Sequence, residues 1–249
     1  MSRAVVIGQS HSAALAQALL TERKEVRGIS VHRLEDRKRP YERDVITLDN
    51  AVSLVRRLPA ATRVFLSTLG TYHNIWGLLR SGPAFDFLLD PCDAPDPNAE
   101  IQVPHRAIAS AFDQHLAKPS LVRKIQAAAK SRVYLLSAPP PKQNNAFMLE
   151  RFMAQKKQSY RGISVGDVGL ERPETRLKLW LMETRATARW AASENLYFVP
   201  APTKAFDDKG FLHPQFYSDA THANGGYGAL VIDQISAITE EALEEPARG

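Results

Sequence analysis

The stretch Ala4-Val5-Val6-Ile7-Gly8-Gln9-Ser10-His11-Ser12 decides the fold that we predict for this chain. Its first four residues form an apolar run typical of a buried strand, and a helical pattern follows over residues 12–22. Alternation of strand and helix is typical of folds built on a parallel sheet. The turn at residues 8–11 therefore lies at the carboxyl end of the first predicted strand.

Four further apolar runs alternate with helical patterns along the chain. The expected strands are residues 26–31, 64–67, 133–136 and 196–199, and the expected helices are residues 48–58, one or two within 108–129, 176–195 and 226–243. This order predicts an α/β fold, a three-layer α/β/α sandwich of flavodoxin-like type with about five parallel strands. We expect one domain over residues 1–249, with residues 81–104 and 142–172 as loop insertions.

Composition sets the frame for the possible functions. The chain has 249 residues, of which 44% are hydrophobic and 24% charged, as in ordinary globular proteins. Its net charge of +5 is diffuse and accompanies no nucleic-acid-binding motif, so we expect no nucleic-acid partner. No apolar run has the length of a membrane span, and the single Cys92 excludes an intramolecular disulfide.

Compartment and cofactors follow from the same inspection. The chain passes from Met1 almost directly into a core strand, so the sequence predicts no signal peptide and a cytoplasmic location. No pair of histidines has convincing metal-ligand spacing, and we therefore expect no metal and no cofactor.

A second informative stretch, Asp219-Ala-Thr-His222-Ala-Asn224-Gly-Gly, precedes the last predicted helix. A serine hydroxyl is a weak nucleophile unless a base takes its proton, and that base needs a carboxylate to orient it. Ser10 with His222 and Asp219 supplies these three groups. Because ligands bind beyond the carboxyl ends of parallel strands, we expect the three to gather at one edge of the sheet.

Each group also has a structural interpretation. Ser10 alone is typical of a helix N-cap or a turn, and Asp219 with His222 is typical of a capping turn before a helix. Their joint occurrence at the two ends of one α/β pattern favours catalysis. Ser12 is expected inside the first turn of the helix, and His11 is expected to be an exposed turn residue.

The chain resembles the SGNH (GDSL-type) hydrolase superfamily over nearly its whole length. The family's first block, Gly-Asp-Ser, stands here as Gly8-Gln9-Ser10, and its last block stands as Asp219, His222, Asn224 and Gly226. The resemblance implies that Ser10 is the nucleophile, that His222 is the general base and acid, and that Asp219 orients His222.

The same resemblance implies an oxyanion hole made by the nucleophile's N–H, a glycine N–H and an asparagine amide. The loop after the second predicted strand has no glycine. The third predicted strand is followed by Gly70-Thr71-Tyr72-His73-Asn74, in which Tyr72 stands at the family's asparagine position. We expect Ser10, Gly70 and Asn74 to form the hole. Asn74 is equally typical of a cap on a helix that begins near Ile75.

Several other side chains are expected to contact substrate. Those predicted are Gln9, Tyr72, His73 and Asn224, with Tyr72, Trp76 and residues 139–145 as pocket walls. Asn224 is also a candidate N-cap, His73 a candidate satisfied loop histidine, and Trp76 a candidate core residue. The basic loop at residues 32–39 is predicted to hold an acidic or carbohydrate substrate, the alternative being a solvated charged loop.

One motif competes with Ser10. Gly162-Ile163-Ser164-Val165-Gly166 matches the Gly-x-Ser-x-Gly elbow of α/β-hydrolases. That elbow needs a strand before it and a helix after it, whereas polar residues precede it here and Gly169 and Pro173 follow it. We therefore favour Ser10 as the nucleophile.

The resemblance implies a serine ester hydrolase that acts through an acyl-enzyme. We expect its partner to be a small acyl ester, such as an O-acetylated sugar. Two alternatives stay open: a glycan O-acyltransferase, which shares the acyl-enzyme, and a non-catalytic carbohydrate-binding protein, which the missing glycine and the altered asparagine block would suit.

Overall fold

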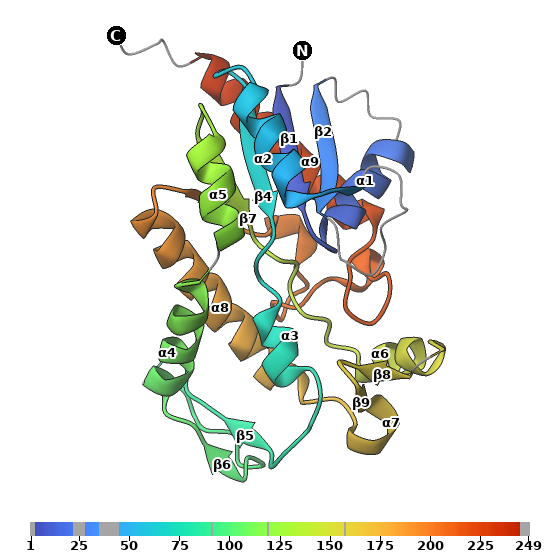
Figure 1. Cartoon of the computed structure of the whole chain (residues 1–249). Helices are drawn as coiled ribbons and strands as arrows, with labels where there is room; N and C mark the ends of the chain where they lie inside the picture. The colour runs from blue at the N-terminus through green and yellow to red at the C-terminus, as the bar shows by residue number, and fades with distance from the viewer. Residues whose placement is uncertain are drawn as a thin grey trace.

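A six-stranded parallel sheet forms the centre of the molecule (Figure 1). The computed structural model describes residues 3–21, 28–34, 45–90, 92–118, 120–156 and 158–244. The strands are β1 (Ala4–Gly8), β2 (Ile29–Leu34), β3 (Val45–Ile46), β4 (Arg63–Ser67), β7 (Val133–Leu136) and β10 (Tyr197–Val199). Their order is β10-β7-β4-β1-β2-β3, and without β3 this is the flavodoxin-like order. The predicted fold class is therefore confirmed.

Both faces of the sheet are covered by helices, because successive residues of its central strand point to opposite sides and all are buried. Ala4 and Val6 pack against α1 (Ser12–Thr21) and α9 (Gly225–Glu244). Val5 and Ile7 face the other layer, formed by α2 (Leu48–Arg57), α5 (Ser120–Ala128) and the end of α8 (Pro173–Ser193). These are the three layers that the sequence predicts.

The predicted elements agree with those found, with small shifts at their ends. The second strand lies at Ile29–Leu34 rather than at residues 26–31, and residues 22–27 lie outside the described part. Helix α8 begins at Pro173, because proline suits the first helical position, where no N–H is needed. The region 108–129 holds the end of α4 (His105–Leu116) and all of α5. No described helix is long and apolar enough to span a membrane.

The two predicted insertions contain short elements. Residues 81–104 form the parallel pair β5 (Phe85–Asp86) and β6 (Ile101–Gln102), and Lys178 on α8 pairs with Asp86 at 2.8 Å. Residues 142–172 form α6 (Asn145–Met153), the hairpin β8 (Ser159–Tyr160) and β9 (Ile163–Ser164), and α7 (Val165–Val168). Both lie beyond the carboxyl ends of the strands, near α3 (Tyr72–Gly77) (Figure 1). Two 3₁₀ turns, Thr203–Ala205 and Pro214–Phe216, complete the described elements.

Candidate active site

The turn between β1 and α1 is tightly fixed. A Cβ on Gly8 would lie 2.6 Å from Ser12 Cβ and 2.9 Å from Ser67 Cβ, so only glycine fits there. Gln9 N–H donates to Ser67 O at 2.9 Å, and the buried Ser12 hydroxyl donates to Gln9 O at 2.6 Å. Ser12 therefore lies in the first helical turn, as predicted, and Ser10 stands half-buried between these two anchors.

Asp219 and His222 form a hydrogen-bonded pair. Asp219 Oδ2 lies 2.8 Å from His222 Nδ1, and its Oδ1 accepts the N–H groups of His222 at 2.7 Å and Thr221 at 2.8 Å. Burial alone would raise the pKa of the Asp219 carboxyl, but these bonds and the charge of His222 hold that pKa well below its ordinary value. An ionised carboxylate only accepts, so the hydrogen is on Nδ1 and Nε2 is free to take a proton.

The Asp219–His222 pair lies against the β1–α1 turn. The rings of His222 and His11 have centroids 5.6 Å apart, and His11 is the chain neighbour of Ser10. Close packing of α9 on α1 produces this approach, because a Cβ on Gly228 would lie 2.0 Å from Ala14 O. Within the described ranges no hydrogen bond joins the Ser10 hydroxyl to His222.

The prediction that His11 is an exposed turn residue is wrong. Both of its ring nitrogens are buried, and neither has a partner in the described part of the chain. Burial, with smaller effects from His222, His73 and Lys142, lowers the pKa of His11 to about 3. The reason is tertiary: the β1–α1 turn faces the loop before α9 rather than solvent. His11 is therefore a neutral imidazole at neutral pH.

Two buried cations support the His222 loop, and sequence reasoning missed both. Lys142 Nζ donates to His222 O at 2.9 Å, and Arg176 donates to Lys142 O at 2.7 Å and to Glu171 O. Burial lowers the pKa of Lys142 to about 8 and that of Arg176 to about 10, so both remain mainly protonated at neutral pH. These hydrogen bonds connect Arg176 on α8, through Lys142, to the loop that holds His222.

A buried carboxylate on α8 fixes the start of α3. Glu183 Oε1 accepts Tyr72 N–H at 3.0 Å, and Oε2 accepts His73 N–H at 2.9 Å and lies 2.8 Å from His73 Nδ1. His73 is therefore buried and hydrogen-bonded within the protein, as its structural interpretation predicts, but it lies in the first turn of α3 rather than in a loop. Helix α3 begins at Tyr72, so Asn74 lies in its first turn and does not cap a helix at Ile75.

Removing this carboxylate should destabilise the protein. Glu183→Ala leaves two buried backbone donors and one imidazole without their acceptor, so we expect the free energy of unfolding to fall by about 3 kcal/mol. Chemical denaturation measures the loss. The exposed Glu174→Ala on the same helix is the matched control and should stay within about 0.5 kcal/mol. A loss as small as the control's would contradict the role of Glu183.

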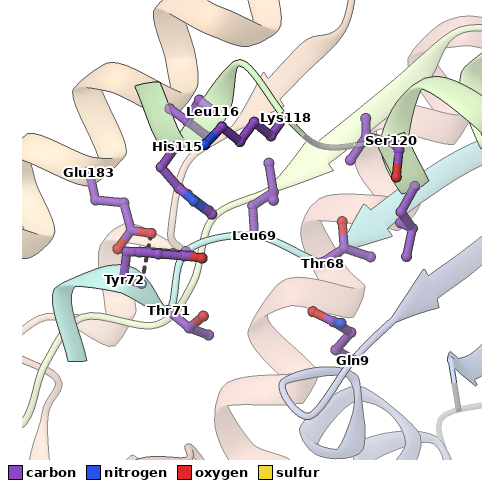
Figure 2. A pocket seen from close by; sticks show the side chains of 13 residues that line it. Gln9, Thr68, Leu69, Thr71, Tyr72, His115, Leu116, Lys118, Ser120 and Glu183 are labelled. Carbon is purple, nitrogen blue, oxygen red and sulfur yellow. Dashed lines mark hydrogen bonds between the residues drawn. The ribbon is translucent and has the colours of Figure 1, made fainter. Parts of the chain in front are cut away.

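The larger of two neighbouring cavities contains two of the predicted substrate contacts. It has a volume of about 270 Å³ and lies at the carboxyl ends of β1 and β4, where the strand order reverses (Figure 2). Gln9 and Tyr72 both line it. The lining also includes Thr68, Leu69, Gly70, Thr71, His115, Leu116, Lys118, Ser120, Leu121, Val122 and Glu183. Its position and lining are those of a ligand pocket.

The smaller cavity contains other predicted site residues. Asn74 and His73 line it, together with His11, Thr221 and residues 139–142. Its volume of about 10 Å³ is that of a site for a single water molecule. Asn74 thus lies on the side of α3 that faces the neighbours of Ser10 and His222.

The predicted loop glycine Gly70 is conformationally required. Its φ is +93°, in the region that favours glycine, and a Cβ there would lie 2.6 Å from Ala138 Cβ. Trp76 packs on Phe112, with ring centroids 4.5 Å apart, and belongs to an apolar cluster rather than to a pocket wall. Tyr72 does form a wall, and its ring lies against that of His115.

Asn224 serves the loop before α9. Its Oδ1 accepts Tyr227 N–H at 3.3 Å, which makes it the predicted N-cap. Its Nδ2 donates to Gln215 O at 2.8 Å and to Tyr217 O at 3.2 Å. Both amide hydrogens are thus bound inside the protein, while Oδ1 can accept one more hydrogen bond, and the predicted substrate contact of Asn224 stays a prediction.

The competing serine lies outside the central sheet. Ser164 ends the two-residue strand β9 of a separate hairpin, and the following helix α7 has only four residues. It is therefore not on a turn at the carboxyl edge of the parallel sheet. Of the predicted basic loop, His32 and Arg33 belong to β2, and residues 35–39 lie outside the described residues. Within the described ranges no three His, Cys, Asp or Glu side chains form a metal-binding group.

Solved structures offer similar folds at low sequence identity. No protein-family model and no curated protein matches the chain. A GDSL-like lipase from Bacteroides thetaiotaomicron is 14% identical over 97% of this chain and 89% of its own, with a TM-score of 0.48. The periplasmic domain of a lipopolysaccharide acetyltransferase from Salmonella ser. Paratyphi A is 16% identical over 96% and 84%, with a TM-score of 0.48.

A third similar structure is the catalytic domain of a peptidoglycan O-acetyltransferase from Streptococcus pneumoniae. It is 12% identical over 98% of this chain and 96% of its own, with a TM-score of 0.40. At these identities the matches assign no residue roles, which have to come from the site itself.

Proposed function

We propose that this protein is a serine ester hydrolase that acts through an acyl-enzyme on Ser10. The observation that carries the proposal is the Asp219–His222 pair, in which both carboxylate oxygens accept hydrogen bonds from the histidine and its loop. This pair lies beside the turn that presents Ser10 at the carboxyl edge of the sheet. A base oriented in this way, next to a half-buried serine, supports nucleophilic catalysis.

In the proposed reaction His222 Nε2 takes the proton of Ser10 as its oxygen attacks the ester carbonyl. The tetrahedral intermediate collapses when His222 returns that proton to the leaving alcohol. A water molecule, activated by the same imidazole, then attacks the acyl-serine and releases the acid. The Ser10 N–H, the Gly70 loop and the Asn74 amide are the proposed oxyanion donors, and each such donor typically contributes about 10²–10³ in rate.

Asp219→Asn tests the orienting role. An asparagine can donate to Nδ1 and so place the hydrogen on Nε2, where it blocks proton abstraction, and we expect kcat to fall by about 10⁴. Because the pKa of the wild-type carboxyl is held below its ordinary value, Asp219 stays ionised as the pH falls from about 8 to about 5. The loss should therefore not depend on the ionisation of Asp219, and it is measured with p-nitrophenyl acetate at about pH 8. A variant as active as wild type at that pH would contradict the proposed role.

The proposed substrate is a small acyl ester, for which an O-acetylated sugar is the first candidate. Glycan O-acyl transfer is the second candidate, since the same acyl-enzyme can be attacked by a sugar hydroxyl instead of water. Product analysis with and without a sugar acceptor separates the two. Free acid alone in both samples supports the hydrolase, and acylated acceptor supports the transferase.

A non-catalytic carbohydrate-binding protein is the third candidate. Two observations favour it: the loop after the second strand lacks the family's glycine, and the described structure has no Ser10–His222 hydrogen bond. Such a protein would keep the Asp219–His222 pair as a capping turn. It would not react with a serine-directed phosphonate, which gives a direct way to distinguish it.

A further inference from the structure

The chemistry of the 270 Å³ cavity differs between its two sides. One wall comes from α4, α5 and the segment between them, and Figure 2 shows Leu116 and His115 there, opposite Gln9 and Thr71. The aliphatic residues of the lining are Leu69, Leu116, Leu121 and Val122. The polar side chains Gln9, Thr68 and Thr71 come from the ends of β1 and β4. The α4–α5 side thus contributes three of the four aliphatic side chains, and the segments after β1 and β4 contribute neutral polar groups together with Leu69.

Charged groups contribute little to this lining. The Glu183 carboxylate is already bound to Tyr72 N–H and to His73. Burial lowers the pKa of His115 below its ordinary value, so its imidazole is neutral at neutral pH. Lys118 is exposed at the rim. The interior therefore suits an uncharged, mainly aliphatic group.

We propose that this cavity receives the acyl chain of the ester, and that the chain is an aliphatic one longer than acetyl. The assignment rests on the proposed function for the reaction, and it replaces the acetyl group of the first candidate substrate with a longer acyl chain. A cavity of about 270 Å³ has room for more than an acetyl group, because a site for one water molecule needs only about 10–15 Å³ on the same measure. A longer chain fills this space and buries its methylene groups against the aliphatic wall.

The polar edge indicates how the ester lies. Gln9 precedes Ser10 in the chain, so the edge it forms is the end of the cavity nearest the proposed nucleophile. Thr68 Oγ1 lies at the same edge, buried, and without a hydrogen-bond partner among the described residues. A buried hydroxyl without a partner is costly unless a ligand supplies one. The ester end of the substrate is the acceptor that we assign to it.

A chain-length series tests the assignment. With p-nitrophenyl acetate, butyrate, hexanoate and octanoate, kcat/KM should rise about fourfold for each added methylene until the cavity is filled. Leu121→Trp, which fills part of the cavity, should move the optimum to shorter chains. Leu20→Trp, at an exposed position on α1, is the matched control and should leave the profile unchanged. An optimum at acetate, or one unaffected by Leu121→Trp, would overturn the proposal.

Thr68→Val separates binding from folding. Valine keeps the shape of threonine and removes a hydroxyl that has no partner, so the free energy of unfolding should stay the same or rise. We expect KM for p-nitrophenyl hexanoate to increase by about tenfold, with kcat less affected. An unchanged KM would contradict the placement of the ester at Thr68. Loss of stability together with activity would show that the hydroxyl has a structural role instead.

A binding measurement distinguishes failure of the cavity from failure of the reaction. Calorimetry of the intact wild-type protein with sodium hexanoate and with sodium acetate needs no turnover. Hexanoate should bind at least tenfold more tightly, and Leu121→Trp should remove the difference. Hexanoate binding without ester hydrolysis would support the cavity and refute the hydrolase. Ester hydrolysis combined with equal affinity for hexanoate and acetate would support the hydrolase and refute the assignment of the cavity.

Discussion

Replacing Ser10 with alanine should reduce kcat for p-nitrophenyl acetate by at least about 10⁴. The variant keeps the Asp219–His222 pair and the cavity, but no oxygen remains to form the acyl-enzyme. The backbone anchors of the turn, from Gln9 N–H to Ser67 O and from the Ser12 hydroxyl to Gln9 O, do not involve the Ser10 side chain. We therefore expect the thermal midpoint to stay within a few degrees of wild type.

Ser164→Ala is the matched control for Ser10→Ala. It removes the hydroxyl of the competing Gly-x-Ser-x-Gly motif, which belongs to the β8–β9 hairpin rather than to the central sheet. Its kcat should equal that of wild type. Full activity in Ser10→Ala, combined with loss in Ser164→Ala, would mean that the nucleophile lies in the hairpin.

His222→Ala should cause a loss of similar size, at least about 10⁴ in kcat, because the serine then has no base to take its proton. Residues that act as one unit are not additive, so Ser10→Ala/His222→Ala should be no slower than either single variant. A further large loss in the double variant would contradict a shared role.

A second comparison distinguishes loss of the His222 imidazole from disturbance of the loop that carries it. The backbone carbonyl of His222, which accepts from Lys142, remains in His222→Ala, so the loop keeps one of its supports. His213→Ala is the control, because that histidine lies at the start of the 3₁₀ turn Pro214–Phe216 rather than in the His222 loop. Its activity should stay within a factor of about three of wild type.

The sheet could be predicted because β1, β4, β7 and β10 contain short apolar runs separated by helical patterns. Ala4 to Ile7 is buried on both faces, and an uninterrupted apolar run is the signature of that environment. The two-residue strand β3 has no such signal. The small elements of residues 142–172 were also missed, because hairpins of two-residue strands depend on local turns rather than on hydrophobic periodicity.

The Asp219–His222 hydrogen bond could be predicted because the two residues are three positions apart and need only one turn to meet. The supports of the site could not, because each joins distant parts of the chain. Glu183 reaches Tyr72 and His73 over more than a hundred residues, and Lys142 reaches His222 from the loop after β7. Sequence spacing carries no information about such contacts.

The burial of His11 could not be predicted either, because it depends on contacts with distant parts of the chain. A histidine in a turn between strand and helix is ordinarily exposed, whereas His11 lies among α3, the loop after β7 and the loop before α9. The cavity is a further case, because its wall is shared between the ends of β1 and β4 and the segment between α4 and α5. Of the predicted site residues, Gln9, Gly70 and Tyr72 line it.

The most direct test of the central claim is to locate the serine that reacts. The folded wild-type protein is incubated with a fluorophosphonate, and the modified peptide is identified by mass spectrometry, with Ser10→Ala and Ser164→Ala treated in parallel. We predict one adduct per chain on Ser10, present in Ser164→Ala and absent from Ser10→Ala. An adduct on Ser164, or a folded protein that takes up no label, would contradict a Ser10 hydrolase.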